Sequence, residues 1–268
     1  MRLAAIDYHL RTSDARLCAQ AKGSNITAIE LTHSTLLADR RWLSQHDGTT
    51  RWFTSAMATG ISLESLSASF AYEWSPIDRK GQADATIMDA VADLVEKAAY
   101  VGAGCVHLPC LEAPPPQNPA DLRRIVNQLA PVLEVARERS LTICLETYWP
   151  ADLARSVAEM DPQNLKVSFD VGNAVAAGRD PVVELETLGP SLGQLRLRDR
   201  RRHEIFRSLP IGHGDVNWSG VQQQVLKLSE RPQIVLASTG GASLVESYAS
   251  SLRLLYNLLN EPAFSRVA

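Results

Sequence analysis

The sequence predicts an α/β fold, a single closed barrel in which eight parallel strands alternate with helices. Short apolar, often β-branched runs recur about eight times, and segments of helical period separate them. The length of 268 residues is usual for one such barrel. Because no composition shift or long Gly/Ser linker marks a boundary, we expect residues 1–268 to form one domain. An open, doubly wound sheet is the alternative.

Eight runs are expected to be strands because most are too short for helices and too apolar for loops. In chain order they are residues 3–7, 26–31, 62–68, 105–108, 141–146, 166–170, 193–197 and 233–238. In a barrel the carboxyl ends of all strands meet at one mouth, where enzymes of this fold do their chemistry. The loops expected at 69–83 and 112–119 therefore lie at that mouth.

Helical periodicity is clearest in three places. The first of these helices has apolar residues at Ile87, Val91, Leu94 and Ala98. Gly102 follows it and can adopt the left-handed backbone conformation that ends a helix. The second helix follows the start signal Asn118-Pro119, and we expect Pro131 to kink or split it. The last helix opens with Ser243 and Glu246 at the spacing of a capping box.

Composition excludes several classes of protein. The 27 basic and 30 acidic side chains give a net charge of −3, which argues against a nucleic-acid binder. No stretch has the length of a signal peptide or a membrane span, so we expect no membrane partner. The four cysteines form no C-x-x-C pair and are too few for a disulfide framework, which favours a reducing cytoplasm.

Polar residues close several of the apolar strands. In a barrel the last inward-facing residue of a strand points at the active site. Singly, each of these residues could cap a helix or hold a loop, but together they indicate a functional site. The set is Asp7, Glu30, His107, Glu146, Asp170 and Arg196.

Glu146 and Asp170 end consecutive strands, which places them about 5 Å apart in strand spacing. Such a pair shares a proton, holds a metal, or binds a cation of the protein itself. The next strand supplies a cation, since Arg196 faces the same side as Gln194 and Arg198.

Seven segments, in this order and spacing, carry a family resemblance over nearly the whole chain. They are Ile-Glu-Leu (29–31), Thr-Gly-Ile-Ser-Leu-Glu-Ser-Leu-Ser-Ala (59–68), Gly-Ala-Gly-Cys-Val-His (102–107), Leu-Glu (145–146), Phe-Asp-Val-Gly-Asn (169–173), Leu-Arg-Leu-Arg-Asp (195–199) and Gly-His-Gly-Asp-Val-Asn-Trp (212–218). On these segments the chain resembles the xylose-isomerase-like TIM barrels, the sugar phosphate isomerase/epimerase superfamily that also includes endonuclease IV.

The resemblance implies a metal site that this chain has altered. The family's usual ligands match Glu146 and Asp170, but Arg196 stands where a ligand His belongs, and residues 234–238 lack the last acid. We therefore expect no cofactor. If the family site is retained instead, Mn, Mg, Co or Zn would bind to the two carboxylates. An Arg196 fork matched to both carboxylates would replace the metal. The alternative is a buried structural ion pair, which preserves the fold and not the chemistry.

The resemblance also suggests substrate contacts. Asn173 stands where the family has a substrate-contacting His, and Arg202 lies six residues after Arg196, where some epimerases bind substrate. We add Glu30 and His213 as candidate contacts, and expect Arg200 and Arg201 to lie in a solvated basic loop. His107 could act as an acid or base, or simply be hydrogen-bonded in place. A phosphate site or a plain turn would explain Thr239, Gly240 and Gly241 before the last helix.

The function implied is isomerisation or epimerisation of a sugar, polyol or keto acid, with a lyase as a related outcome. Glu146 or Asp170 would abstract a proton beside a carbonyl, and Arg196 would stabilise the oxyanion. The alternative is a non-catalytic descendant that binds a small polyhydroxy ligand or a protein partner, and a homo-oligomer is compatible with either. An abasic-site nuclease is disfavoured because metal ligands are missing and the net charge is negative.

Overall fold

The computed structural model describes residues 3–6, 18, 21–22, 27–32, 46–72 and 85–237. Within them, eight parallel strands pair in chain order and close into a barrel, because β1 pairs with both β2 and β8. The predicted barrel is thus confirmed and the open sheet is excluded. The strands are β1 (Leu3–Ile6), β2 (Ala28–Thr32), β3 (Ser62–Ser67), β4 (Cys105–Pro109), β5 (Thr142–Glu146), β6 (Leu165–Asp170), β7 (Leu192–Leu197) and β8 (Gln233–Leu236).

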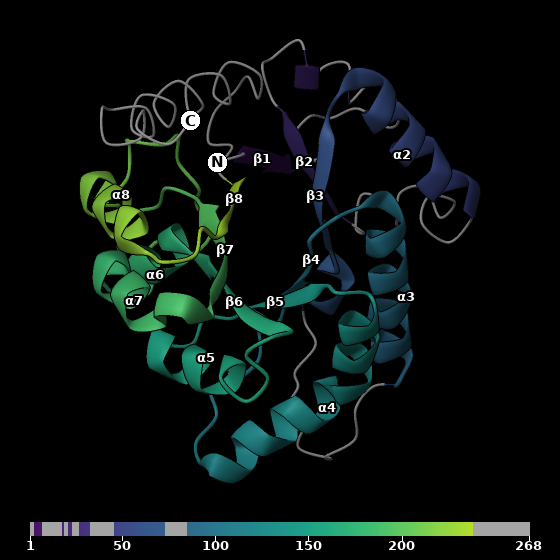
Figure 1. Ribbon diagram of the computed structural model, residues 1–268. Helices are drawn as coiled ribbons and strands as arrows, with labels where there is room; N and C mark the ends of the chain where they lie inside the picture. Colours follow the sequence, from purple (N-terminus) through teal and green to yellow (C-terminus); the bar gives the residue numbers. More distant parts are fainter. Residues whose placement is uncertain are drawn as a thin grey trace.

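The helices surround the barrel (Figure 1). Among them α3 packs on α4, α5 packs on α7, and α7 packs on α8. The helices are α2 (His46–Thr59), α3 (Ala85–Val101), α4 (Pro119–Glu138), α5 (Ala151–Ala158), α6 (Val171–Ala176), α7 (Pro181–Leu188) and α8 (Trp218–Lys227), with short 3₁₀ turns η3 (Ser69–Ala71) and η4 (Gly189–Ser191). None of these described helices has the length and apolar character needed to cross a membrane.

The signals predicted for the end of α3 and for the start of α4 are both confirmed. Gly102 follows α3 with φ of 76°, the left-handed conformation that favours glycine. Asn118 caps α4, because its side-chain oxygen accepts hydrogen bonds from the backbone N–H groups of Ala120 and Asp121. Pro131 does not split the helix, because α4 is one element across it, and the alternative expectation of a kink stays a prediction. Proline removes one helical hydrogen bond, but the apolar face is buried on both sides of Pro131 and holds the helix together.

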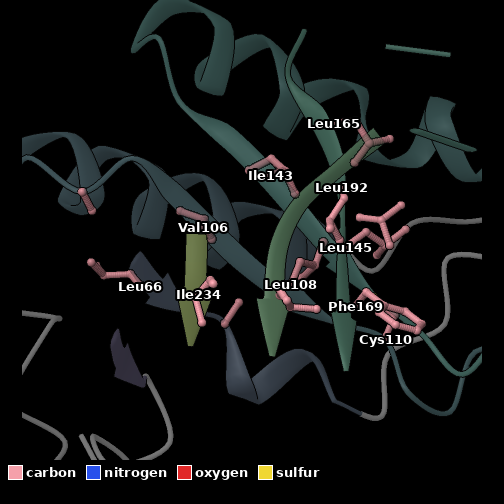
Figure 2. Packing of buried hydrophobic residues seen from close by; sticks show 14 of the residues in the cluster. Leu66, Val106, Leu108, Cys110, Ile143, Leu145, Leu165, Phe169, Leu192 and Ile234 are labelled. Atoms are coloured by element: carbon pink, nitrogen blue, oxygen red, sulfur yellow. The ribbon is translucent and has the colours of Figure 1, made fainter. Parts of the chain in front are cut away.

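The core lies between the barrel and its helices. Alternate strand residues face outward into it, and Figure 2 shows Leu66, Val106, Leu108, Ile143 and Leu165 packed there. The residues between them face the barrel interior and are polar on several strands. This alternation follows from the pleat of a strand, and it places the polar strand ends at one site.

Some predicted features lie outside the described residues. These are the strand end at Asp7, the loop residues 73–83 and the last helix with Ser243 and Glu246. The beginning of the expected loop at 69–83 is the 3₁₀ turn η3 rather than irregular chain. The extent of the domain, residues 1–268, stays a prediction.

Candidate functional site

A polar network fills the barrel interior beneath the mouth. Gln194 Nε2 on β7 donates hydrogen bonds to Glu30 Oε2 (3.0 Å) and to Gln233 Oε1 (2.9 Å). Ser65 Oγ donates to the same Glu30 oxygen at 2.8 Å, and Ser168 Oγ donates to Gln194 Oε1 at 2.8 Å. These bonds join β2, β3, β6, β7 and β8, so they fix Glu30 in the middle of the barrel.

Arg196 bridges two carboxylates above this network. Its Nη1 donates to Glu30 Oε1 at 2.9 Å and to Glu30 Oε2 at 3.1 Å, and its Nε lies 3.5 Å from Glu146 Oε2. The predicted fork between Glu146 and Asp170 is therefore wrong. Glu30 is fully buried, and an ionised carboxylate there requires a cation, so Arg196 reaches across the barrel to it.

Two side chains besides Arg196 contact Glu146 at the end of β5. His107 Nε2 lies 2.7 Å from Glu146 Oε2, and Asn173 Nδ2 donates to Glu146 Oε1 at 3.1 Å. The other ring nitrogen of His107, Nδ1, lies 2.8 Å from Ser67 Oγ. Since the carboxylate only accepts, Nε2 of His107 carries the proton in this contact. The structure thus brings His107, Asn173, Arg196 and Glu146 together as predicted.

Asp170 pairs with Arg198 rather than Arg196. Arg198 Nε lies 2.9 Å from Asp170 Oδ2, and Asp170 Oδ1 accepts a hydrogen bond from the backbone N–H of Asn173 at 2.9 Å, which caps α6. Gly172 allows this arrangement, because a Cβ there would lie only 2.7 Å from the carbonyl oxygen of Arg198. The alternation along β7 had placed Arg198 on the correct face, but it did not reveal this partner.

The cluster is ionised although it is buried. Burial raises the pKa of Glu146, but the hydrogen bond from His107 and the charge of Arg196 outweigh burial and lower it from 4.5 to about 2. Burial likewise raises the pKa of Glu30, and Arg196 reverses the effect, so its net pKa lies below the ordinary value. Burial lowers the pKa of Arg196, while Glu30 and Glu146 raise it well above the ordinary range. The three groups therefore hold each other charged at neutral pH.

Glu146 should make the stability of the protein depend on pH in the acidic range. Its folded-state pKa is about 2 against 4.5 in the unfolded chain, so its contribution is present above pH 4.5 and is lost as the pH falls through 2. The full contribution is on the order of 3 kcal/mol. We expect the difference in free energy of unfolding between the wild type and Glu146→Gln to shrink steadily from pH 5 to pH 2. Urea titrations across that range measure it, and a constant difference would contradict the assignment.

Two predicted contacts lie outside the cluster. Arg202 is exposed, and its Nη1 donates to the backbone oxygen of Gly178 at 2.9 Å. His213 is also exposed. The substrate-binding roles of both residues stay predictions. The candidate phosphate-binding residues Thr239, Gly240 and Gly241 lie outside the described residues.

The basic segment after β7 is only partly as predicted. Arg201 is exposed, as expected for a solvated loop, but Arg200 is only 5% exposed, so the prediction for Arg200 is wrong. The backbone explains the difference: Asp215 N donates to Arg200 O at 2.9 Å, which folds the following loop back against residue 200.

Asp199 organises that loop, a role that the sequence reasoning missed. Its carboxylate accepts hydrogen bonds from the backbone N–H groups of Gly212 (2.7 Å), Gly214 (3.0 Å) and Val216 (3.4 Å) and from Trp218 Nε1 (3.1 Å). Asp199 is fully buried. An acid directly after a strand, followed by a glycine-flanked segment, was the available signal. The loop therefore rests on the end of β7.

The residues at the mouth do not fit the four-ligand metal site that the family resemblance implies. Each of the two carboxylates that would be ligands already has an arginine beside it, Arg196 at 3.5 Å from Glu146 and Arg198 at 2.9 Å from Asp170. Position 237 is a buried alanine at the end of the last strand. No group of three His, Cys, Asp or Glu side chains with metal-binding geometry occurs in the described ranges. Guanidinium groups next to two carboxylates repel a divalent ion.

The metal content of the purified protein should therefore be far below one ion per chain. We expect elemental analysis for Mn, Mg, Co and Zn after mild purification to show this, and Arg196→His alone should not create tight Mn²⁺ binding. Adding Ala237→Glu to Arg196→His should strengthen the binding, because Val235 pairs in register with Arg196 and Ala237, two residues later, faces the same side. A tightly bound ion near one per chain in the wild type would contradict this reading of the donor set.

Comparison with known proteins identifies the barrel type. Residues 18–258 match the family model described as xylose isomerase-like TIM barrel. A search of curated proteins gives no match.

Solved structures that have the same fold include the following three. A D-tagatose 3-epimerase-like protein is 18% identical with a TM-score of 0.75, covering 100% of both chains. The 3-keto-D-glucoside 4-epimerase YcjR from E. coli is 13% identical with a TM-score of 0.76, covering 96% of this chain and 99% of its own. The IOLI protein, solved with a zinc atom, is 14% identical with a TM-score of 0.74, covering 97% and 98%. At these identities the similarity concerns the fold.

Proposed function

The chain belongs to the xylose isomerase-like TIM barrel family, and we propose that it isomerises or epimerises a small polyhydroxy carbonyl compound by moving a proton beside the carbonyl. One observation carries the proposal: an ionised Glu146 lies at the barrel mouth within 3.5 Å of a guanidinium nitrogen that has no hydrogen bond of its own within the described part of the chain. A base and a donor for an oxyanion are the two groups that enolisation requires.

Glu146 is the proposed base. Its carboxylate takes the proton as the C–H bond beside the carbonyl breaks, and the electron pair forms the C=C bond of an enediolate. The hydroxyl proton then passes from one oxygen of the enediolate to the other, and the proton on Glu146 returns to the neighbouring carbon, which completes an isomerisation with no other reactant. His107 and Asn173 hold the two carboxylate oxygens, so they are positioning residues for this step.

Arg196 is the proposed electrophile. Its Nη1 is committed to Glu30, whereas its Nε–H faces Glu146 at 3.5 Å without a good hydrogen bond. An oxyanion formed next to Glu146 can accept from that N–H. The polar network around Glu30 keeps the guanidinium from turning away, so the cation is in place before substrate binds. This is the task that a divalent metal performs in metal-dependent enolisation.

Epimerisation needs a second group on the opposite face of the enediolate. Asp170 is the candidate, since β6 lies next to β5 in the barrel and Arg198 keeps the Asp170 carboxylate at the mouth. Asn173 adds an acceptor: its Oδ1 is buried and lacks a hydrogen-bond partner among the described residues, which suits a substrate hydroxyl.

Solvent exchange tests the proposal without knowledge of the product. We expect the purified protein to introduce deuterium from D₂O beside the carbonyl of at least one compound in a panel of ketoses, aldoses and hydroxylated keto acids. NMR or mass spectrometry locates the label, and heat-inactivated protein is the control. A panel that covers these classes without any exchange would contradict the proposed chemistry.

A second candidate is a non-catalytic binder of the same ligands. The observation that favours it is that both acids already have partners within the protein. Glu146 contacts His107 and Arg196, and Asp170 contacts Arg198. Under this alternative, calorimetry detects binding of a polyhydroxy compound that undergoes no exchange.

The setting of the protein is part of the proposal. All four cysteines are free and buried, which suits the reducing cytoplasm that we propose as its location. Its partner is a small polyhydroxy molecule, and a homo-oligomer stays a prediction that light scattering can test.

A further inference from the structure

Arg200 is a buried cation without a partner among the described residues. Its side chain is only 5% exposed, and its Nε and Nη1 atoms are buried without a hydrogen bond. Leaving buried donors unpaired costs free energy, and the cost is larger for a charged group. A buried polar group without a partner calls for a physical explanation, and a ligand that pairs with it at a functional site is one such explanation.

Arg200 lies three residues beyond Leu197, the carboxyl end of β7, so it is at the same barrel mouth as the proposed catalytic groups. Burial lowers the pKa of Arg200 and the neighbouring charge of Arg198 lowers it further, while Asp170, Tyr148 and Glu146 act in the opposite direction. Asp170 and Glu146 already have arginines of their own in Arg198 and Arg196. Arg200 is thus within electrostatic reach of the site and is not neutralised by a bond to it.

Tyr148 supplies a second donor near Arg200. It lies two residues after Glu146 in the loop that follows β5 and is half-buried. The charge of Arg200 acts on the Tyr148 hydroxyl, so the two side chains lie within electrostatic reach of each other. A phenol keeps its proton at neutral pH, so this hydroxyl can donate a hydrogen bond.

We propose that Arg200, together with Tyr148, binds a carboxylate group of the substrate, so that the compound processed at this mouth is a sugar acid or hydroxylated keto acid rather than a neutral sugar. This inference rests on the proposed function and names its substrate class. A planar guanidinium matches a carboxylate in a two-point hydrogen-bonded geometry.

The charge of the site favours a monoanion. The carboxylates of Glu30, Glu146 and Asp170 already lie beside two guanidinium groups, those of Arg196 and Arg198. Among the described residues, Arg200 is the nearby guanidinium group whose Nε and Nη1 have no hydrogen bond. A substrate carboxylate adds one negative charge next to these acids, whereas a phosphate dianion adds nearly two. Since repulsion from the fixed acids grows with that charge, a carboxylate fits the site better.

Hydrogen bonds to the backbone and to Asp199 fix the position of the chain at Arg200. Asp199 is fixed by the loop N–H groups and Trp218, and the carbonyl of Arg200 accepts from Asp215 N. An arginine whose backbone is fixed and whose side chain is buried loses little conformational freedom when the anion arrives. Arg201, the next residue, is exposed and offers a matched control.

Binding of small fragments tests the carboxylate site without turnover. Glycerate, glycerol and inorganic phosphate are titrated into the full-length protein and followed by calorimetry or NMR. We expect glycerate to bind at least tenfold more tightly than glycerol and more tightly than phosphate. Arg200→Met should lose that preference, Arg200→Lys should keep part of it, and Arg201→Met should keep it in full. Equal binding of glycerate and glycerol, tighter binding of phosphate, or an Arg200→Met variant that binds like wild type would overturn the proposal.

Thermal melting separates a ligand site from a structural role. Because Arg200 has no partner among the described residues, its burial should cost stability, so Arg200→Met should melt no lower than wild type. A melting temperature several degrees lower would show that an acid of the chain pairs with Arg200, which overturns the inference. Failure of the proposed function looks different: glycerate still binds through Arg200, and no compound exchanges deuterium.

Discussion

Glu146→Gln is expected to lower the rate of deuterium exchange by about 10² or more while the barrel stays folded. Gln has nearly the shape of Glu and can keep contacts to His107 and Asn173, but its amide cannot take a proton. Arg196 retains Glu30 as a partner at 2.9 Å, so the substitution does not leave an isolated buried cation. The stability loss should stay within about 3 kcal/mol, the value that the lowered pKa of Glu146 implies.

Exchange rates and urea unfolding of the same preparations measure the two effects. Glu134→Gln is the matched control, because Glu134 lies on the exposed face of α4 and should change neither. If Glu146→Gln loses stability and the wild type shows no exchange, the non-catalytic alternative is correct. If the variant exchanges at the wild-type rate, Glu146 is not the base.

Arg196→Met should give the largest loss of stability at this site, roughly 3–5 kcal/mol, because it leaves buried acids without their cation. Glu30 is fully buried, and both of its carboxylate oxygens accept hydrogen bonds from Arg196 Nη1. Glu146 loses the nitrogen at 3.5 Å at the same time. Exchange should also disappear, because the proposed oxyanion donor is gone.

A double substitution tests the cause of that loss. In Arg196→Met/Glu30→Gln the uncompensated charge on Glu30 is removed, so much of the stability should return, while exchange should not. Arg137→Met is the control, since Arg137 forms a surface pair with Asp161 at 2.9 Å and should cost less than about 1 kcal/mol. An Arg196→Met variant as stable as the Arg137→Met control would show that the buried pairs contribute little.

The fold was predictable because the alternation of residue types along each strand indicates which side chains face the barrel interior. Leu165–Asp170 alternates between apolar residues that pack under the helices and polar residues that face the barrel interior, and Thr142–Glu146 does the same except at Cys144. The regular return of such runs along the chain indicates a barrel. The unbroken helix across Pro131 was not predictable from local rules, because burial on both sides of the proline decides it.

The members of the site were predictable, but their partners were not. Strand order places Glu146, Asp170 and Arg196 on neighbouring strands, and that order suggested a bridge between them. Barrel closure instead lets Arg196 reach Glu30, which lies 166 residues earlier. The burial of Arg200 depends on a loop that folds back through Asp215. Neither contact can be predicted from the residues near it in the sequence.

The exchange rate of metal-depleted protein is the most informative single measurement. The protein is treated with a chelator, dialysed and assayed in D₂O before and after addition of Mn²⁺, with an active compound from the panel. Since Arg196 stands beside Glu146 as the resident cation, we expect the same rate in both samples. A rate that vanishes on chelation and returns with Mn²⁺ would contradict an arginine-based site.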